Sequence, residues 1–356
     1  MRGGAMNRLD HPLYQEDLER VAACDVDWSA LDGSTVAISG ATGMVGTFLV
    51  DVLMHKARTD GLDVLVVALG RNEAKARERL PYFDDPRFSF EELDISVHGP
   101  RPKAEADVFV HLASTTHPRA YATQPIGTIT SNVVGLQNLL DYALDCAADG
   151  ARFVFASSVE VYGQNRGDVE RFDEQYCGYL DCNTLRAGYP ESKRLGEALC
   201  QAYAAERGAR VWVPRLPRIY GPTLLPSDTK ALSQFLHKAV AGENVVLKSE
   251  GTQEFSYLYV ADAVAGLLWV LTRGEAGLAY NVADPSGDIM LRDLAGKIAR
   301  AGGGDVVFEL PDAVERAGYS TATKALLDGT RLRELGWKPM YTFDEGIART
   351  VELLKA

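Results

Sequence analysis

Short apolar runs alternate with longer stretches of helical periodicity along the first two thirds of the chain. The apolar runs are typical of strands buried on both faces of a parallel sheet, and they cover Thr35–Ser39, Val64–Leu69, Val108–Leu112, Arg152–Ala156 and Arg210–Pro214. The helical stretches repeat apolar residues every three or four positions, and they cover Leu13–Ala23, Gly46–Leu53, Ile129–Ala143 and Ser192–Glu206. This alternation predicts a doubly wound α/β fold with a parallel sheet.

The alternation weakens after Tyr220, where glycine and proline residues predict a loop before a helix over Lys230–Ala239. A later helix over Asp262–Leu271 is expected to pack back on the first domain. We therefore expect two domains that are interleaved in sequence. The dinucleotide-binding domain would comprise residues 1–215 and about 262–283, and the smaller substrate-binding domain would comprise about 216–261 and 284–356.

The composition narrows the class of protein. The length of 356 residues suits about two domains, and the net charge of -12 argues against a general affinity for nucleic acid or anionic membranes. The five cysteines show no CxxC spacing and no cluster with histidine, so we expect reduced thiols and no metal site. No signal peptide is recognisable, and no apolar run approaches the ~20 residues of a membrane span. These features predict a cytoplasmic protein with small-molecule partners.

Three glycines follow the first expected strand at the spacing GxxGxxG. Gly40 would allow a tight turn, Gly43 would let the backbone approach a pyrophosphate, and Gly46 would let the next helix sit close to the strand. Free N–H groups at the start of that helix favour an anion. The loop therefore predicts a dinucleotide site in a Rossmann fold. The other loop residues expected at this site are Thr42, Met44 and Val45.

The end of the second strand bears on the choice of dinucleotide. It carries Arg71, whereas NAD enzymes usually place a carboxylate there to bind the ribose hydroxyl. An arginine suits the 2′-phosphate of NADP, although it could also stack on adenine or be a solvated surface charge. Asp94 and Ile95 are expected close to the adenine of either dinucleotide. The cofactor is therefore NAD or NADP.

Tyr189 and Lys193 are four residues apart and therefore lie on one face of an expected helix. A tyrosine has an ordinary pKa of about 10, and a neighbouring ammonium that stabilises the phenolate lets it exchange a proton with a substrate hydroxyl. Ser157 and Ser158 end a strand upstream, where their hydroxyls could reach the same pocket. The pattern predicts proton transfer at a substrate hydroxyl.

Together these features resemble the extended short-chain dehydrogenase/reductase family, in particular its NAD-dependent epimerase/dehydratase type. The resemblance runs from about Thr35 to the end of the chain, and its motifs are the glycine loop, His111–Ala113, Asn132, Ser158, the Tyr189/Lys193 pair, Arg218–Pro222 and Tyr257–Asp262. It implies that the nicotinamide takes hydride from a sugar carbon while Tyr189 removes the hydroxyl proton, helped by Lys193 and Ser158. It also implies a homodimer, and cofactor contacts from Leu112, Ala113, Ser114, Asn132, Tyr189 and Lys193.

Glu160 separates branches of this family. It resembles the glutamate that sugar dehydratases and uronate decarboxylases carry two residues after the catalytic hydroxyl, and it could serve as a second base. Dehydratases normally place an aspartate directly before it, and this chain has Val159 there, so simple 4,6-dehydration is less expected. Glu160 could also point away from the substrate.

The segments expected to hold a phosphate depart from the family pattern. The sugar enzymes usually carry an asparagine before the YGP segment and an arginine before the YVxD segment, whereas this chain has Arg218 and Phe255. Arg218 could bind a pyrophosphate oxygen, or it could be a structural arginine at the domain seam. Ser157 is the other candidate for a substrate contact. The acidic stretch between Ser158 and Tyr189 could wall the pocket or face solvent.

The leading hypothesis is an NAD(P)-dependent nucleotide-sugar epimerase that forms a keto intermediate and returns the hydride to its other face. A second hypothesis keeps the oxidation but uses Glu160 for dehydration or decarboxylation. A third is an NADPH-dependent reductase of a nucleotide-linked sugar or polyol, for which Arg71 is the main indication. The intact set of Ser158, Tyr189 and Lys193 disfavours a dinucleotide sensor without catalysis.

Overall fold

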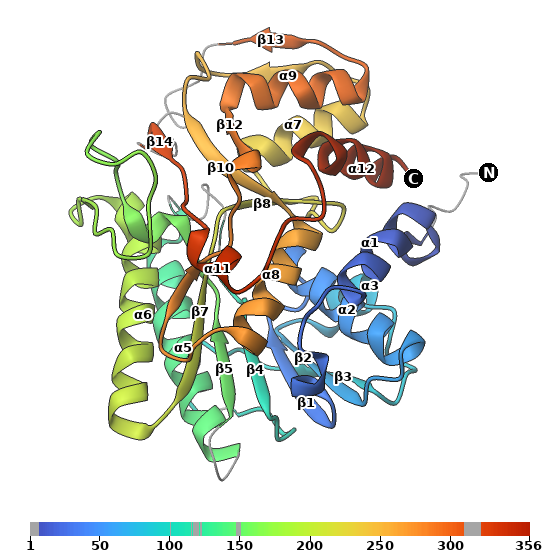
Figure 1. The fold of residues 1–356 in the computed structure, drawn as a ribbon, viewed down its shortest axis with the longest axis vertical. Helices are drawn as coiled ribbons and strands as arrows, with labels where there is room; N and C mark the ends of the chain where they lie inside the picture. Colours follow the sequence, from blue (N-terminus) through green and yellow to red (C-terminus); the bar gives the residue numbers. More distant parts are fainter. Residues whose placement is uncertain are drawn as a thin grey trace.

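The computed structural model describes residues 7–99, 101–114, 116, 121, 123–146, 151–309 and 322–356. Its main feature is a parallel sheet with the strand order β11-β7-β5-β4-β1-β2-β3 (Figure 1). These strands span Ser34–Ser39 (β1), Val64–Gly70 (β2), Phe88–Glu92 (β3), Val108–His111 (β4), Arg152–Phe155 (β5), Arg210–Leu216 (β7) and Ala279–Asn281 (β11). A short strand, β6 (Ser157–Ser158), pairs with the end of β7. The predicted doubly wound sheet is confirmed.

The predicted strands occupy the centre of this sheet, and the edge strands β3 and β11 are additional. Side chains of the central strands are buried on both faces. In β1, for example, Val36 and Ile38 belong to one cluster of buried side chains, whereas Ala37 belongs to another. Successive residues of a strand point to opposite faces, so an almost continuous apolar run is what such a strand requires.

Helices cover both faces of the sheet (Figure 1). Residues of α5 and α6 share a buried cluster with Phe153, whereas residues of α1, α2 and α8 share one with Val154. The helices span Pro12–Ala22 (α1), Met44–Thr59 (α2), Glu73–Arg79 (α3), Pro125–Cys146 (α5), Gly188–Arg207 (α6) and Val260–Arg273 (α8). All of them except α3 correspond to predicted helices. Within the described ranges, no helix has the length and apolar character needed to cross a membrane.

A smaller part of the molecule is built on a second sheet, in which β10 pairs with β8, β12 and β14, and on a parallel pair of β9 and β13. The strands span Arg218–Tyr220 (β8), Val245–Leu247 (β9), Glu254–Tyr259 (β10), Asp288–Met290 (β12), Val306–Phe308 (β13) and Lys324–Ala325 (β14). The helices span Ala231–Val240 (α7), Leu291–Gly302 (α9), Thr330–Glu334 (α11) and Phe343–Lys355 (α12). Of the strands and helices in this smaller part, the sequence predicts only α7. Most of the strands span three residues or fewer, so they show no clear alternation of apolar and polar positions.

The chain moves back and forth between the two sheets. β8 and β10 belong to the small sheet, β11 returns to the large one, and β12 belongs to the small sheet again. At the junction, Asp262 of α8 accepts a hydrogen bond from the Met340 amide at 2.6 Å. This order agrees with interleaved domains, whose boundaries stay a prediction. Short 3₁₀ helices span Arg8–Asp10 (η1), Trp28–Leu31 (η2), Val159–Tyr162 (η3), Leu185–Ala187 (η4) and Pro285–Gly287 (η5).

Candidate active site

The glycine loop between β1 and α2 has the geometry of a phosphate-binding turn. Gly40 has a φ of 74°, and a Cβ added to it would lie 2.7 Å from the Ala113 amide nitrogen. A Cβ on Gly46 would lie 2.2 Å from the Gly40 carbonyl oxygen, so only glycine lets α2 approach β1 this closely. Gly43 is the N-cap of α2 and makes no side-chain cap hydrogen bond, which leaves the first amides of the helix available to an anion. The loop therefore fits a dinucleotide pyrophosphate.

The other residues expected at the dinucleotide surround this loop. The segment after β4 passes close to Gly40, since a Cβ there would lie 2.8 Å from the Leu112 carbonyl carbon. The expected residues all lie in the loop, in the first turn of α2 or directly after β4, and they are Thr42, Met44, Val45, Leu112, Ala113 and Ser114. Their contact with the dinucleotide stays a prediction.

Asn132 is fully buried in α5 and joins the segment after β4 to the catalytic helix. Its Oδ1 accepts a hydrogen bond from Ser114 Oγ at 2.7 Å, and its Nδ2 donates to Ser192 Oγ at 2.8 Å. Ser192 in turn donates to the backbone carbonyl of Tyr189 at 2.8 Å. Asn132 therefore positions the start of α6, in addition to the cofactor contact predicted for it.

Arg71 and Asp94 follow the neighbouring strands β2 and β3. The hydroxyl and amide of Ser96 donate to Asp94 Oδ1 at 2.6 and 3.0 Å; they lower the pKa of the Asp94 carboxyl, and the Arg71 charge lowers it further. The side chain of Ile95 lies against Gly135 of α5. Arg71 and Asp94 are thus brought to one edge of the sheet, as binding of either NAD or NADP would require.

Tyr189 and Lys193 lie buried in the first two turns of α6. Lys193 Nζ donates to the Ala156 carbonyl at 2.7 Å and lies 4.7 Å from the centre of the Phe155 ring. Burial lowers the pKa of Lys193 to about 8 and raises the pKa of Tyr189 to about 12. A hydrogen bond with Ser158 acts in the opposite direction and lowers the pKa of Tyr189. Ser158 therefore favours the phenolate of Tyr189, and the help expected from Lys193 stays a prediction.

Glu160 lies in η3, and its carboxylate pairs with an arginine close to Tyr189. Its Oε2 accepts a hydrogen bond from Arg186 Nη2 at 2.8 Å. The Arg186 guanidinium lies 4.8 Å from the centre of the Tyr121 ring, and Tyr121 stacks on Tyr189 with ring centroids 5.1 Å apart. In addition to the effect of burial, the Glu160 charge raises the pKa of Tyr189 and the Arg186 charge lowers it. Glu160 is therefore close enough to Tyr189 to influence its ionisation.

Two members of this cluster, Arg186 and Tyr121, carry no motif in the sequence. Arg186 precedes Tyr189 by three residues, a spacing that places two side chains on one face only if helical structure continues between them. It does so here, because η4 leads directly into α6. Tyr121 gives no such signal, and only the fold brings its ring onto Tyr189.

Ser157 is buried, and its hydroxyl donates to Glu197 Oε1 of α6 at 2.5 Å. Glu197 also pairs with Arg215 of β7, with 2.6 Å between Nη2 and Oε2. Ser157 thus takes part in a link between α6 and the sheet. The substrate contact predicted for it stays a prediction.

Arg218 and Phe255 lie on the neighbouring strands β8 and β10. The strands are parallel with Arg218 opposite Tyr257, and the Arg218 guanidinium lies 3.5 Å from the centre of the Phe255 ring. Arg218 Nη1 is buried without a hydrogen-bond partner among the described residues. Because an unsatisfied buried donor is costly, this guanidinium is suited to an anionic ligand. The phosphate contact predicted for Arg218 stays a prediction.

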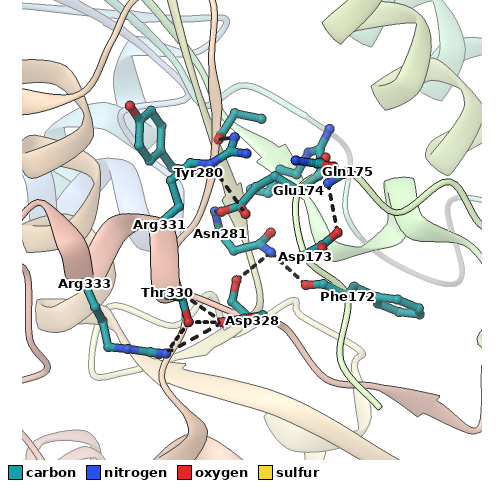
Figure 2. Close-up of polar contacts among 12 residues, drawn as sticks. Phe172, Asp173, Glu174, Gln175, Tyr280, Asn281, Asp328, Thr330, Arg331 and Arg333 are labelled. Atoms are coloured by element: carbon teal, nitrogen blue, oxygen red, sulfur yellow. Dashed lines mark hydrogen bonds and ion pairs between the residues drawn. The ribbon is translucent and has the colours of Figure 1, made fainter. Parts of the chain in front are cut away.

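A buried asparagine anchors the segment between η3 and α6 (Figure 2). Asn281 Nδ2 donates to the carbonyls of Phe172 and Asp328, both at 2.9 Å, and its amide donates to Glu174 Oε1 at 2.8 Å. Arg331 Nε lies 3.7 Å from the other Glu174 oxygen. Glu174 therefore makes an interior contact, whereas Asp168, Glu170 and Asp173 of the same acidic stretch are exposed.

Known proteins match both the sequence and the fold. A sequence model of the NAD dependent epimerase/dehydratase family matches residues 36–283, more than half of the chain. UDP-glucuronic acid decarboxylase 1 of Xenopus tropicalis is 30% identical over 335 residues, which cover 92% of this chain and 73% of that protein.

Two solved structures show how far the similarity extends. DesIV, a dTDP-glucose 4,6-dehydratase of Streptomyces venezuelae with NAD bound, is 28% identical with a TM-score of 0.75, and the match covers 90% of this chain and 96% of DesIV. A UDP-galactose 4-epimerase is 27% identical with a TM-score of 0.72, covering 90% of this chain and 98% of the other. The chain therefore belongs to the NAD-dependent epimerase/dehydratase family.

Proposed function

We propose that this protein decarboxylates a nucleotide-linked uronic acid through a keto intermediate, with NAD as cofactor. The observation that carries the proposal is the position of Glu160, whose carboxylate contacts Arg186 and lies close enough to Tyr189 to raise its pKa. Epimerisation at the oxidised carbon needs only the Ser158, Tyr189 and Lys193 set, whereas a second acid–base group serves a reaction at the neighbouring carbon. Similarity to UDP-glucuronic acid decarboxylases over 88–92% of the chain supports the same choice.

The glycine loop is the proposed binding site for the pyrophosphate of NAD, at the N-terminus of α2. When bound, NAD would supply the hydride acceptor for the carbon that carries the reacting hydroxyl. We favour NAD over NADP because the family is NAD-dependent and DesIV binds NAD. Arg71 would then stack on the adenine, and Asp94 would lie beside it.

Tyr189 is proposed to take the proton from the sugar hydroxyl. With a pKa raised by burial to about 12, it would otherwise hold its own proton at neutral pH. The hydrogen bond with Ser158 favours the phenolate. Lys193, with a pKa of about 8, stays mostly charged at pH 7 and adds positive charge to the same helix face.

Glu160 is proposed to act at the carbon next to the ketone. In a keto uronate the bond to the carboxylate breaks, CO₂ leaves, and the electron pair of that bond forms an enolate. The same carbon then takes up a proton, which we propose that Glu160 draws from solvent and delivers. The keto carbon is finally reduced again, so the whole reaction consumes a proton and causes no net redox change.

Arg218 is proposed to bind the diphosphate of the substrate. Its stacking on Phe255 holds the plane of the guanidinium, so its N–H groups can meet two phosphate oxygens at once. The unpaired Nη1 supports this role, because a phosphate would satisfy it.

Mass spectrometry of the nucleotide products tests the proposal after incubation with UDP-glucuronate and NAD. Decarboxylation gives a product lighter by CO₂, whereas epimerisation gives an isomer of unchanged mass. An isomer alone would favour the second candidate, an epimerase, for which the intact Ser158, Tyr189 and Lys193 set is sufficient. Denaturation of the purified protein should release NAD in stoichiometric amount. An empty protein that binds NADPH reversibly would favour a reductase.

We also propose a homodimer formed through α5 and α6. Ile126 and Ile129 of α5 are 80% and 43% exposed, and Leu195 of α6 is 51% exposed. Large apolar side chains exposed on two adjacent helices are typical of a protein interface. Sedimentation equilibrium tests the proposal, since it gives twice the chain mass for a dimer.

A further inference from the structure

Arg186 connects the two acid–base groups of the proposed reaction. Its Nη2 contacts Glu160 Oε2 at 2.8 Å, and its guanidinium lies on the ring of Tyr121, which stacks on Tyr189. Its Nη1 is buried and has no hydrogen-bond partner within the described part of the chain. The same cation thus reaches Glu160 directly and Tyr189 through one intervening ring.

Two acidic groups that lie close together oppose each other's ionisation, because a first negative charge makes a second harder to form. Glu160 has this effect on Tyr189, because its charge raises the Tyr189 pKa in addition to the increase that burial causes. The Arg186 charge lowers the same pKa. Removal of Arg186 would therefore leave the Glu160 charge uncompensated beside the tyrosine.

The other cations near the pocket have partners of their own. Lys193 donates to a backbone carbonyl, and Lys230 pairs with Asp228 at 3.3 Å. In the part of the chain that the structure describes, Arg186 is the cation that contacts Glu160.

We propose that Arg186 is a positioning residue that holds and neutralises Glu160, so that Glu160 and the Tyr189 phenolate can act in the same pocket. The inference rests on the proposed function only in assigning the oxidation to Tyr189 and the later proton transfer to Glu160. Arg186 acts through these two partners and takes no part in bond making itself.

Single-turnover absorbance of the reduced nicotinamide tests the inference, because it reports the oxidation step alone. R186M should slow the oxidation about tenfold, a coupling of the size found between contacting residues. Adding E160Q to R186M should restore most of the oxidation rate, because it removes the uncompensated charge, whereas decarboxylation, which is assigned to Glu160, should be lost. A purely structural role predicts that the double variant oxidises no faster than R186M, and that result would overturn the inference.

The pH dependence of the oxidation rate is a second measurement. A loss of packing alone would not shift this dependence along the pH axis. In R186M the profile should shift to higher pH, and R186K should bring it back toward the wild type. R166M is the matched control, since exposed Arg166 lies in the same segment and stacks on Tyr179 at 4.0 Å; it should leave the profile unchanged. An unshifted profile in R186M contradicts the inference.

Two experiments distinguish a wrong role for Arg186 from a wrong proposed function. Normal decarboxylation by E160Q would remove Glu160 from the proposed reaction, and the R186M profile would still decide the role of Arg186 at Tyr189. An ultraviolet titration, read as the difference between each protein and its Y189F variant, follows the Tyr189 phenolate without substrate. R186M should raise the midpoint of that titration, and an unchanged midpoint overturns the inference.

Discussion

The dinucleotide side and the substrate side of the proposed active site differ in the chemical groups that line them. On the dinucleotide side the loop is made of glycine and backbone, and a Cβ on Gly46 would lie 2.2 Å from a backbone oxygen. On the substrate side, long cationic side chains lie on aromatic rings, as Arg218 does on Phe255 and Arg186 on Tyr121. In the proposed site, one side would admit its ligand by shape, and the other would attract it by charge.

This difference determines what each side tolerates. A steric fit to backbone fails with a single added carbon, because packed interiors have almost no spare volume. A guanidinium can instead be supplied from another position, as we propose for Arg218 on β8, which lies on the ring of Phe255 on the neighbouring strand β10. We therefore expect members of the family to share the dinucleotide side and to differ on the substrate side, where the reaction is decided.

The largest effect is expected from Tyr189→Phe, which removes the proton acceptor and keeps the ring. Turnover of UDP-glucuronate should fall about 10²- to 10⁴-fold, the usual contribution of a general acid–base group. The dissociation constant of NAD, measured by calorimetry, should change little because the glycine loop is untouched. A variant that turns over at the wild-type rate would exclude the proposed proton transfer.

The sequence predicts the dinucleotide side better than the substrate side. The glycine loop and the Tyr189/Lys193 pair each lie within one short segment, so their spacing carries the information. Glu160 and Arg186 are 26 residues apart in the chain, and their contact depends on how the connecting segment folds. The connection of Tyr121 to Tyr189 is equally non-local.

The fold shows the same contrast. The central strands of the large sheet are buried on both faces, and their apolar runs make them visible in the sequence. The strands of the small sheet mostly span three residues or fewer, and β9, for example, covers only Val245–Leu247. Strands this short take their conformation from tertiary pairing, which no local pattern reports.

Gly46→Ala should disrupt the glycine loop between β1 and α2. Its Cβ would collide with the Gly40 carbonyl and push α2 away from β1, at a cost of about 1–3 kcal/mol in the free energy of unfolding. NAD affinity should fall with it, because the first amides of α2 move. Gly43→Ala is the matched comparison, since its Cβ would lie 3.1 Å from the same oxygen. That variant should keep its stability in urea and lose mainly NAD affinity; equal stability losses would contradict the separate roles.

Arg218→Gln should weaken the substrate side alone. The KM for the nucleotide substrate should rise about 10- to 100-fold, as expected for loss of a charge-assisted contact, while NAD affinity stays unchanged. The double variant R218N/F255R, which restores the usual family pattern on the two strands, should recover part of the substrate affinity. An unchanged KM in R218Q would show that Arg218 is a structural arginine of the small sheet.

The smallest effect on activity is expected at the junction between the two sheets, where Asp262 of α8 accepts a hydrogen bond from the Met340 amide. Burial raises the pKa of the Asp262 carboxyl from its ordinary 3.8 to about 7. The folded protein therefore keeps this proton at pH values where the unfolded chain has lost it, so the free energy of unfolding should fall as pH rises from about 4 to about 7, by at most about 4 kcal/mol.

Asp262→Asn removes the titrating group and should flatten this part of the stability profile, with little change in turnover near neutral pH. Urea unfolding at several pH values between about 4 and 8 measures the effect. Asp25→Asn is the control, because the Asp25 side chain is 85% exposed and should leave the profile as it is. If the variant and the wild type lose stability in parallel over this range, Asp262 is not the source of the pH dependence, and the contact between the two sheets does not titrate there.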